Sequence, residues 1–332
     1  MRYLKQREIQ LALLIVLLVL LVGLRSPVFL TPGSLANLLT DSTLLIMLAL
    51  AQMFVIITRG IDLSVASNLA LSGMLSALLA VQYPHLPLPL VVLAALGIGL
   101  LLGLINGYLI GYLDLPPIVV TLGTMSVYRG LVFVLSGGAW VSSHQMPAAF
   151  IDFPLARLLG VTHLVWIALA AILATCFLAR YTRFGRDLYA IGNQPQAARY
   201  VGIATARRLL WTYGLSGLMA GLCGYLWVAR YAVAYSEIAY GFEFTVIAAC
   251  VIGGISIAGG AGTVGGAVLG SLFLAVINNA LPIVKVSPFW QSALTGIVIL
   301  TAVLLNARGT RNMGRQILPL TLQAPSTRRS AA

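Results

Sequence analysis

Long apolar runs recur along the 332-residue chain and decide its fold class. Two of them read LALLIVLLVLLVGL at 11–24 and LPLVVLAALGIGLLLGLINGYLIGYL at 88–113. A helix of about 20 apolar residues crosses a bilayer and satisfies its own backbone hydrogen bonds there. Only 8% of the residues are charged, whereas soluble domains carry about 25%. The sequence therefore predicts an all-α polytopic membrane protein.

Hydropathy predicts about ten transmembrane helices, and an even number places both termini on the same side. The runs at 64–81, 117–136, 243–259 and 263–281 are the weakest, because they are rich in Gly, Ser and Thr. The predicted spans lie at 9–24, 42–58, 64–81, 88–112, 117–136, 163–180, 209–229, 243–259, 263–281 and 289–307.

The basic residues indicate which side is cytoplasmic. With the N-terminus inside, the inner segments hold 15 of the 20 basic residues, the outer segments hold four, and Arg129 falls within a span. Cytoplasmic loops carry an excess of Lys and Arg, so we expect an N-in, C-in protein with 180–208 in the cytoplasm. Juxtamembrane arginines facing membrane lipid also account for the net charge of +12, and we expect no nucleic-acid binding.

The chain divides into a transmembrane domain, 1–307, and a basic cytoplasmic tail, 308–332, which we expect to lack fixed structure. Within the domain, RGIDLSVASNLALSG (59–73) faintly resembles GGISIAGGAGTVGG (253–266), and 104–123 resembles 276–296. Membrane transporters are often built from two such halves. A weak two-fold internal repeat is the resulting expectation.

The segment RYTRFGRDLYAIGNQPQAARYVGIATARR (180–208) concentrates six arginines in a chain that is otherwise poor in charge. Pro195 suits the first turn of a helix and Gly202 suits a C-cap, so we expect a short helix over 196–201. Ala197, Ala198 and Val201 then share a face of small side chains that another protein can approach closely. A plain connecting loop is the alternative.

Several kinds of chemistry find no motif in the sequence. The chain has no G-x-x-x-x-G-K-[ST] nucleotide loop, and its histidines and cysteines lack metal-site spacing, so we predict no metal site and no catalytic residues. GLSGLMAG (214–221) favours close packing of helices over a serine nucleophile. Asp62 is expected to form a local ion pair with Arg59. Transporters driven by ion gradients usually place more ionisable groups than these in their spans.

Four ordered blocks resemble bacterial ABC-importer permeases of the ribose, galactose, arabinose and xylose class. The blocks are GIDLSVAS (60–67), with Ala66 where Gly is usual, PPIVVTLGTMSVYRG (116–130), GRDLYAIGNQPQAARYVGI (185–203) and IAACVIGGISIAGGAGTVGGAVLG (247–270). The likeness runs from about residue 8 to 307. It implies a multi-pass protein of the bacterial inner membrane.

The resemblance also implies a transport subunit, not an enzyme, with specific partners. These are an ATPase on separate chains that binds ATP and Mg, a second permease in a homo- or heterodimer, and a periplasmic sugar-binding protein; this chain itself would bind no cofactor. The ATPase-coupling residues implied are Gly185, Ala190, Gly192, Asn193, Ala197, Ala198 and Gly202. The signature residues, with a structural role, are Gly60, Asp62, Ser64, Gly253, Gly254, Gly259 and Gly260.

The transported sugar is the least determined feature. SGGAWVSSHQMPAAF (136–150), GYLWVARYAVAY (224–235) and NALPIVKVSPFWQ (279–291) look most similar to rhamnose-type permeases, and autoinducer-2 permeases come next. A self-sufficient secondary transporter is the alternative from another class. The polar span residues expected on the path are Asn68, Asn106, Thr121, Thr124, Asn278 and Asn279, each of which also suits interhelical hydrogen bonding.

Overall fold

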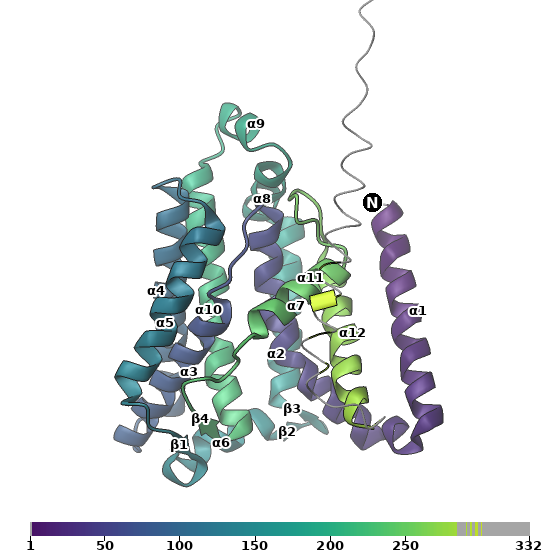
Figure 1. Ribbon diagram of the computed structural model, residues 1–332, viewed down its shortest axis with the longest axis vertical. Coiled ribbons are helices and arrows are strands. Elements are labelled where there is room, and N and C mark those ends of the chain that lie inside the picture. Colours follow the sequence, from purple (N-terminus) through teal and green to yellow (C-terminus); the bar gives the residue numbers. More distant parts are fainter. Residues whose placement is uncertain (1, 284–289, 291–292, 294–295, 298–299, 301–332) are drawn as a thin grey trace, which may run out of the picture.

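A computed structural model describes residues 2–283 together with residues 290, 293, 296–297 and 300. Within this part, eight helices are long and apolar enough to cross a membrane. They are α1 (Arg2–Arg25), α2 (Pro32–Ile57), α3 (Val65–Gln82), α4 (Leu88–Gly111), α5 (Pro117–Ser136), α7 (His163–Tyr181), α10 (Thr205–Tyr231) and α12 (Val264–Ile283). The prediction of an all-α polytopic membrane protein is confirmed (Figure 1).

Shorter elements connect the spans. The helices are η1 (Pro27–Leu30), η2 (Ser143–Gln145), α6 (Ala148–Leu155), α8 (Arg183–Asn193), α9 (Pro195–Tyr200) and α11 (Phe242–Ile252). Two antiparallel two-stranded ribbons pair β1 (Val141–Ser142) with β4 (Val233–Ala234) and β2 (Arg157–Leu158) with β3 (Val161–Thr162). The β1–β4 pair joins segments that are some ninety residues apart in sequence, with Val141 opposite Ala234.

The predicted helical span 243–259 is helical over only part of its length. Its helical part, α11, has 11 residues, and at 1.5 Å per residue it is too short to cross the apolar core of a bilayer. The chain between β4 and α11 is non-helical and runs from the end that carries the ribbons toward the middle of the bundle (Figure 1). The predicted span 289–307 falls mostly outside the described residues, and the tail 308–332 falls wholly outside them.

Helix α2 forms the centre of the bundle. From Thr43 to Ile57 every residue is buried, as expected for a helix that is apolar all round and surrounded by other helices. Helices α7, α10, α11 and α12 pack against it. Helix α1 lies at the edge and exposes most of its apolar side chains, which suits contact with lipid (Figure 1).

The two ends of the bundle carry different segments. The N-terminus lies at the same end as α8 and α9, whereas α6 and both ribbons lie at the opposite end (Figure 1). At the end with α8 and α9, Arg199 of α9 forms an ion pair with Asp114, between α4 and α5, at 3.6 Å. At the same end, Thr263, just before α12, donates a hydrogen bond to Glu8 of α1. Since the inner excess of basic residues belongs to this end, it is the cytoplasmic one.

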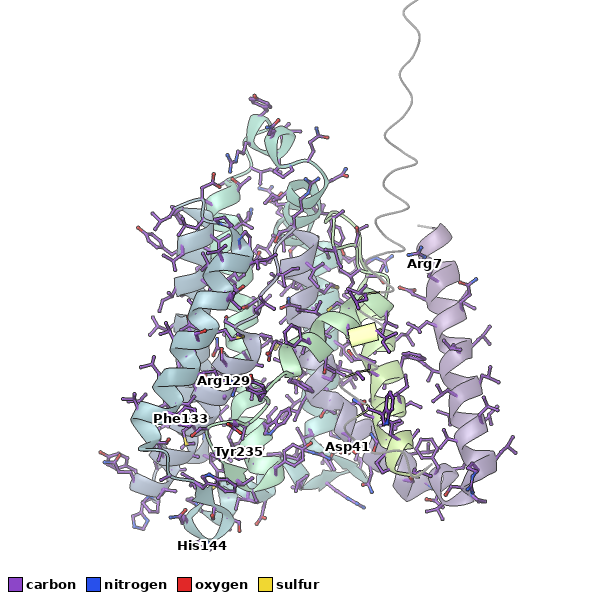
Figure 2. The ribbon with its side chains drawn as sticks, in the orientation of Figure 1. Arg7, Asp41, Arg129, Phe133, His144 and Tyr235 are labelled. Carbon is purple, nitrogen blue, oxygen red and sulfur yellow. The ribbon has the colours of Figure 1, made fainter. Side chains whose placement is uncertain are left out.

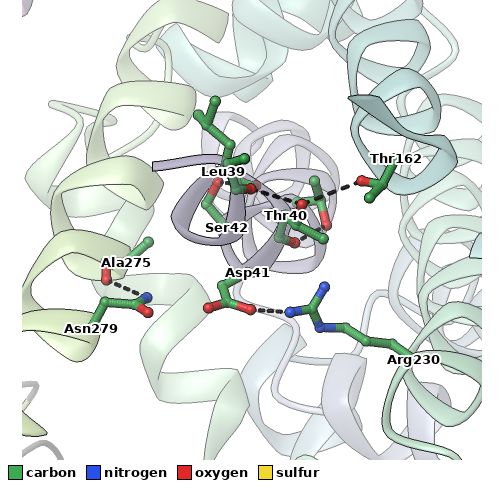
Figure 3. Close-up of polar contacts among 10 residues, drawn as sticks. Leu39, Thr40, Asp41, Ser42, Thr162, Arg230, Ala275 and Asn279 are labelled. Atoms are coloured by element: carbon green, nitrogen blue, oxygen red, sulfur yellow. Dashed lines mark hydrogen bonds and ion pairs between the residues drawn. The ribbon is translucent and has the colours of Figure 1, made fainter. Parts of the chain in front are cut away.

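The internal repeat expected from the sequence does not extend over both pairs of segments. Segments 59–73 and 253–266 both begin at the cytoplasmic end, after α2 and α11 respectively. By contrast, 104–123 joins α4 to α5 at the cytoplasmic end, while Asn279 of α12 lies beside Asp41 near the outer end (Figures 2 and 3). The described part of the second segment, 276–283, therefore lies at the opposite end of the molecule from the connection between α4 and α5.

Candidate functional site

The cytoplasmic segment 180–208 folds into two helices whose ends match the local sequence signals. The Thr182 hydroxyl caps α8 by accepting a hydrogen bond from the Gly185 N–H at 3.1 Å. Pro195 begins α9. Gly202, with φ of +85°, ends α9 in a Schellman motif, in which Ile203 N–H donates to Ala198 O and Gly202 N–H to Arg199 O, both at 3.0 Å. The predicted helix start and stop are confirmed.

The surface of α9 differs from the predicted one. Ala198 is buried against the rest of the chain, so it does not share an exposed face with Ala197 and Val201. The side chains that project into solvent are instead those of Tyr200, 90% exposed, and Val201, 76% exposed. Ala197 and Gly202 are exposed beside them. The outward surface of this helix is thus partly aromatic, a feature that the sequence interpretation missed.

Helix α8 is joined to the membrane helices at a junction of three segments. Gly260 N–H donates to the Ile57 carbonyl at the end of α2, at 2.9 Å. Gly192 packs on the same carbonyl so closely that a Cβ there would overlap Ile57 O and lie 2.5 Å from Gly260 N. Gly185 packs with similar closeness on the last turn of α7. We call the contact of 57–60, 192–193 and 259–260 the cytoplasmic junction.

Arg59 holds the cytoplasmic junction together. Its Nε donates to Gly192 O at 2.7 Å and its Nη2 to Asn193 O at 2.8 Å, so the guanidinium caps the C-terminus of α8. The backbone of Arg59 adopts a φ of +67°. The predicted ion pair with Asp62 is wrong, because the side chain turns to the α8 carbonyls instead.

A second contact ties α8 to the loop that precedes α12. The Tyr189 hydroxyl donates to Gly262 O at 2.9 Å, and burial raises the pKa of the Tyr189 phenol above its usual 10. The phenol therefore keeps its proton at neutral pH and remains a donor. Helix α8 is thus connected both to this loop and to the end of α2.

Asp62 forms the centre of a buried polar network, which lies between the cytoplasmic junction and the start of α3. It is 2% exposed and accepts hydrogen bonds from Ser64 N–H at 3.0 Å, Ser64 Oγ at 2.7 Å and Ser216 Oγ at 2.9 Å. Asn106 Nδ2 donates to Ser64 Oγ at 2.8 Å, and Thr121 Oγ1 donates to Ile61 O at 3.0 Å. The segment 58–64 is thereby bonded to α4, α5 and α10.

The six residues expected on the transport path fall into two groups. Asn68, Asn106 and Thr121 are buried between helices, and Asn68 Nδ2 donates to Gly99 O at 3.1 Å. Thr124, Asn278 and Asn279 are half-buried. Of the remaining named residues, Gly60 packs against the Tyr213 hydroxyl and Gly253 against Gly266. Gly254 and Gly259 lie in left-handed turns, and Ala190 is half-buried in α8.

At the outer end, an ion pair joins the central helix to α10. Asp41 of α2 binds Arg230 of α10, and Asn279 of α12, whose Nδ2 donates to Ala275 O at 3.0 Å, lies on the other side of the carboxylate (Figure 3). Nε and Nη1 of Arg230 are buried and have no hydrogen-bond partner in the described part of the chain. This pair joins α2 to α10 at the end opposite the cytoplasmic junction.

Replacing Asp62 by alanine tests the importance of the buried network. Asp62→Ala leaves the Ser64 N–H and the Ser216 hydroxyl without an acceptor, and each buried unpaired donor costs about 1–3 kcal/mol. We expect a loss of roughly 3 kcal/mol in stability, measured by thermal unfolding of the purified permease. Asp114→Ala is the control, since Asp114 is exposed and pairs only at 3.6 Å; equal stability of the two variants would show that the network contributes little.

The class of protein is thus a helical membrane protein with two short cytoplasmic helices, α8 and α9. Helix α8 is hydrogen-bonded directly to the loop between α2 and α3. Residues 34–303 match the family model described as "Branched-chain amino acid transport system / permease component". The chain belongs to this family of transport permeases. Among the described residues, no group of three or more His, Cys, Asp or Glu is placed to hold a metal ion.

Curated relatives are similar over nearly their full length. The autoinducer 2 import system permease protein LsrC of Escherichia coli (strain K12 / DH10B) is 35% identical over 93% of this chain and 91% of its own length. Its counterpart in Salmonella typhi is 34% identical over 93% of this chain and 89% of its own length. No solved structure shows significant similarity to the chain. The resemblance to sugar-importer permeases and the location in the inner membrane are confirmed.

Proposed function

We propose that the chain is the membrane-spanning permease of an ATP-driven importer of autoinducer 2, received from a periplasmic binding protein. The observation that carries this proposal is 35% identity over 93% of the chain to an autoinducer 2 permease. The family description names branched-chain amino acids, whereas the relatives import autoinducer 2. Membership of the family therefore does not identify the transported solute. The sequence interpretation favoured rhamnose, and the relatives support its alternative, autoinducer 2, better.

The coupling role rests on the geometry of the cytoplasmic junction. Helices α8 and α9 project from the bundle at the cytoplasmic end, where an ATPase chain can reach them (Figure 1). A shift of α8 acts on α2 through Gly192 and on the Asp62 network through Arg59, three residues before Asp62. Binding of ATP by the partner can thus bias the transmembrane helices between two states. ATP and Mg belong to that partner in this proposal, and a second permease completes the pair.

An uptake assay tests the proposal. Cells lacking the chain should lose uptake of autoinducer 2 from the medium, and the plasmid-borne chain should restore it. Uptake of L-rhamnose, followed in the same cells, should not change. Depleting ATP should abolish uptake, because the ATPase drives it. Loss of rhamnose uptake alone would establish the competing sugar, and uptake that persists without ATP would indicate a secondary transporter.

A further inference from the structure

An apolar groove lies on the surface where α4 and α10 meet, at one edge of the bundle (Figure 1). Its volume is about 320 Å³, and clefts that hold small molecules begin at about 300 Å³. Leu101 is 60% exposed and Tyr108 is 52% exposed, so the groove is open to the surrounding membrane. The lining residues are Leu101, Leu104, Ile105, Tyr108 and Leu109 of α4 and Leu210 of α10.

The depth of the groove matches the inner leaflet of the bilayer. Helix α4 runs toward the cytoplasmic end, and Leu101 and Leu109 both fall in its second half. At 1.5 Å per residue these two positions are about 12 Å apart along the helix axis. Half of an apolar core of about 30 Å is about 15 Å. The groove therefore covers most of the depth that the acyl chains of the inner leaflet occupy.

The cytoplasmic end of the groove carries polar groups. Tyr108 and Tyr112 stack there with 5.6 Å between ring centroids, and both are 52% exposed. Amphipathic rings of this kind favour the level of the lipid headgroups. Arg207 is exposed and precedes Leu210 by three residues. The two side chains therefore share a face of α10, with the arginine one turn nearer the cytoplasm.

Arg207 has no counter-charge within the described residues. Its side chain forms no ion pair and no hydrogen bond there. The acids of the adjoining segments are already paired: Asp187 binds Arg208 at 2.6 Å, and Asp114 binds Arg199 at 3.6 Å. A guanidinium presents donors in a fork that fits a phosphate. Arg207 is thus available to an anion from outside the chain.

We propose that the groove and Arg207 bind one anionic phospholipid of the inner leaflet. An acyl chain lies along the apolar wall of α4, and the phosphate accepts hydrogen bonds from the Arg207 guanidinium. Basic clefts between transmembrane helices on the cytoplasmic side are typical sites for anionic headgroups. The site does not depend on the transported solute. A lipid bound here would bridge α4 and the start of α10, which directly follows α9.

A second copy of the chain is the competing occupant of this surface. A two-fold axis along the membrane normal would bring the cytoplasmic ends of both copies to the same depth. Arg207 would then need an acid from the other copy at that depth, where Asp114 and Asp187 already have partners. A phosphate supplies the missing negative charge without breaking either pair. The observations therefore favour the lipid.

Mass spectrometry of the intact purified permease, released from detergent micelles, tests the site by counting bound lipids. The probes are phosphatidylglycerol and phosphatidylcholine with identical acyl chains, and the first should bind more tightly. Arg207→Gln should weaken phosphatidylglycerol binding about fivefold or more and leave phosphatidylcholine unchanged. Arg207→Lys should keep most of the preference. Arg186→Gln, at an exposed arginine of α8 that does not line the groove, is the matched control.

A second pair of variants tests the groove itself. Leu101→Trp fills the groove and should weaken the binding of both lipids. Leu93→Trp changes a leucine of α4 with the same 60% exposure outside the groove and should have no such effect. Equal binding of the two lipids, or an unchanged preference in Arg207→Gln, would overturn the anionic site. A lipid-free dimer that Leu101→Trp dissociates would also overturn it and assign this surface to a second copy.

Discussion

Gly217→Leu is expected to prevent α4 and α10 from packing and so to unfold the permease. Gly217 of α10 lies against Gly103 and Gly99 of α4; a Cβ at 217 would lie 2.7 Å from the Gly103 Cα and overlap the Gly99 carbonyl oxygen. Overpacking usually costs about 1–3 kcal/mol where side chains can move. Here the obstacle is backbone on the facing helix, which small residues admit to close contact. We therefore expect a loss of about 3 kcal/mol or more.

The matched control for this substitution lies on the facing helix. Gly97→Leu adds the same side chain to α4 at a position where a Cβ would meet nothing within 4 Å. Detergent-solubilised Gly97→Leu should stay monodisperse and keep the thermal stability of the original chain, whereas Gly217→Leu should aggregate. Equal behaviour of the two variants would mean that the contact between α4 and α10 tolerates separation.

The sequence predicted the transmembrane helices correctly where a long apolar run is enough to identify them. It failed at 243–259, because hydropathy does not register the backbone. Helix α11 ends at Ile252, and Gly254 directly after its C-cap adopts a φ of +83° while Ile255 N–H donates back to Cys250 O at 3.0 Å. The apolar neighbours of this turn still read as a membrane span. The ends of α9 were predictable, since Pro195 and Gly202 act through their own backbone preferences.

The candidate site was less predictable because its contacts are distant in sequence. Arg59 and Asp62 are close neighbours and suggested an ion pair, yet Arg59 bonds residues 133 and 134 positions away. Ser216, which donates to Asp62 across 154 positions, looked like one more small residue in a helix contact. Such contacts depend on tertiary packing, which periodicity and local motifs do not encode.

The exposed end of α9 is expected to dominate the affinity for the ATPase. Tyr200 and Val201 project from the cytoplasmic end with 90% and 76% of their surface exposed. Tyrosine is enriched among the residues that contribute most of the energy of an interface, and Val201 lies directly beside it. Val201→Asp would bury an unpaired carboxylate in that contact. A loss of about 2 kcal/mol, or roughly 30-fold in affinity, should appear as failure of the ATPase to co-purify with the membrane-inserted permease.

Two further substitutions in α9 locate the docking surface. Gln196→Asp adds the same charge at an exposed position in the first turn of the helix and should leave co-purification nearly unchanged. Ala198→Trp, which would have probed the docking face had Ala198 been exposed, should instead distort α9 itself, because Ala198 is buried against its own chain. Undiminished co-purification with Val201→Asp would mean that the ATPase does not contact this end of α9, and α8 would then be the segment to test.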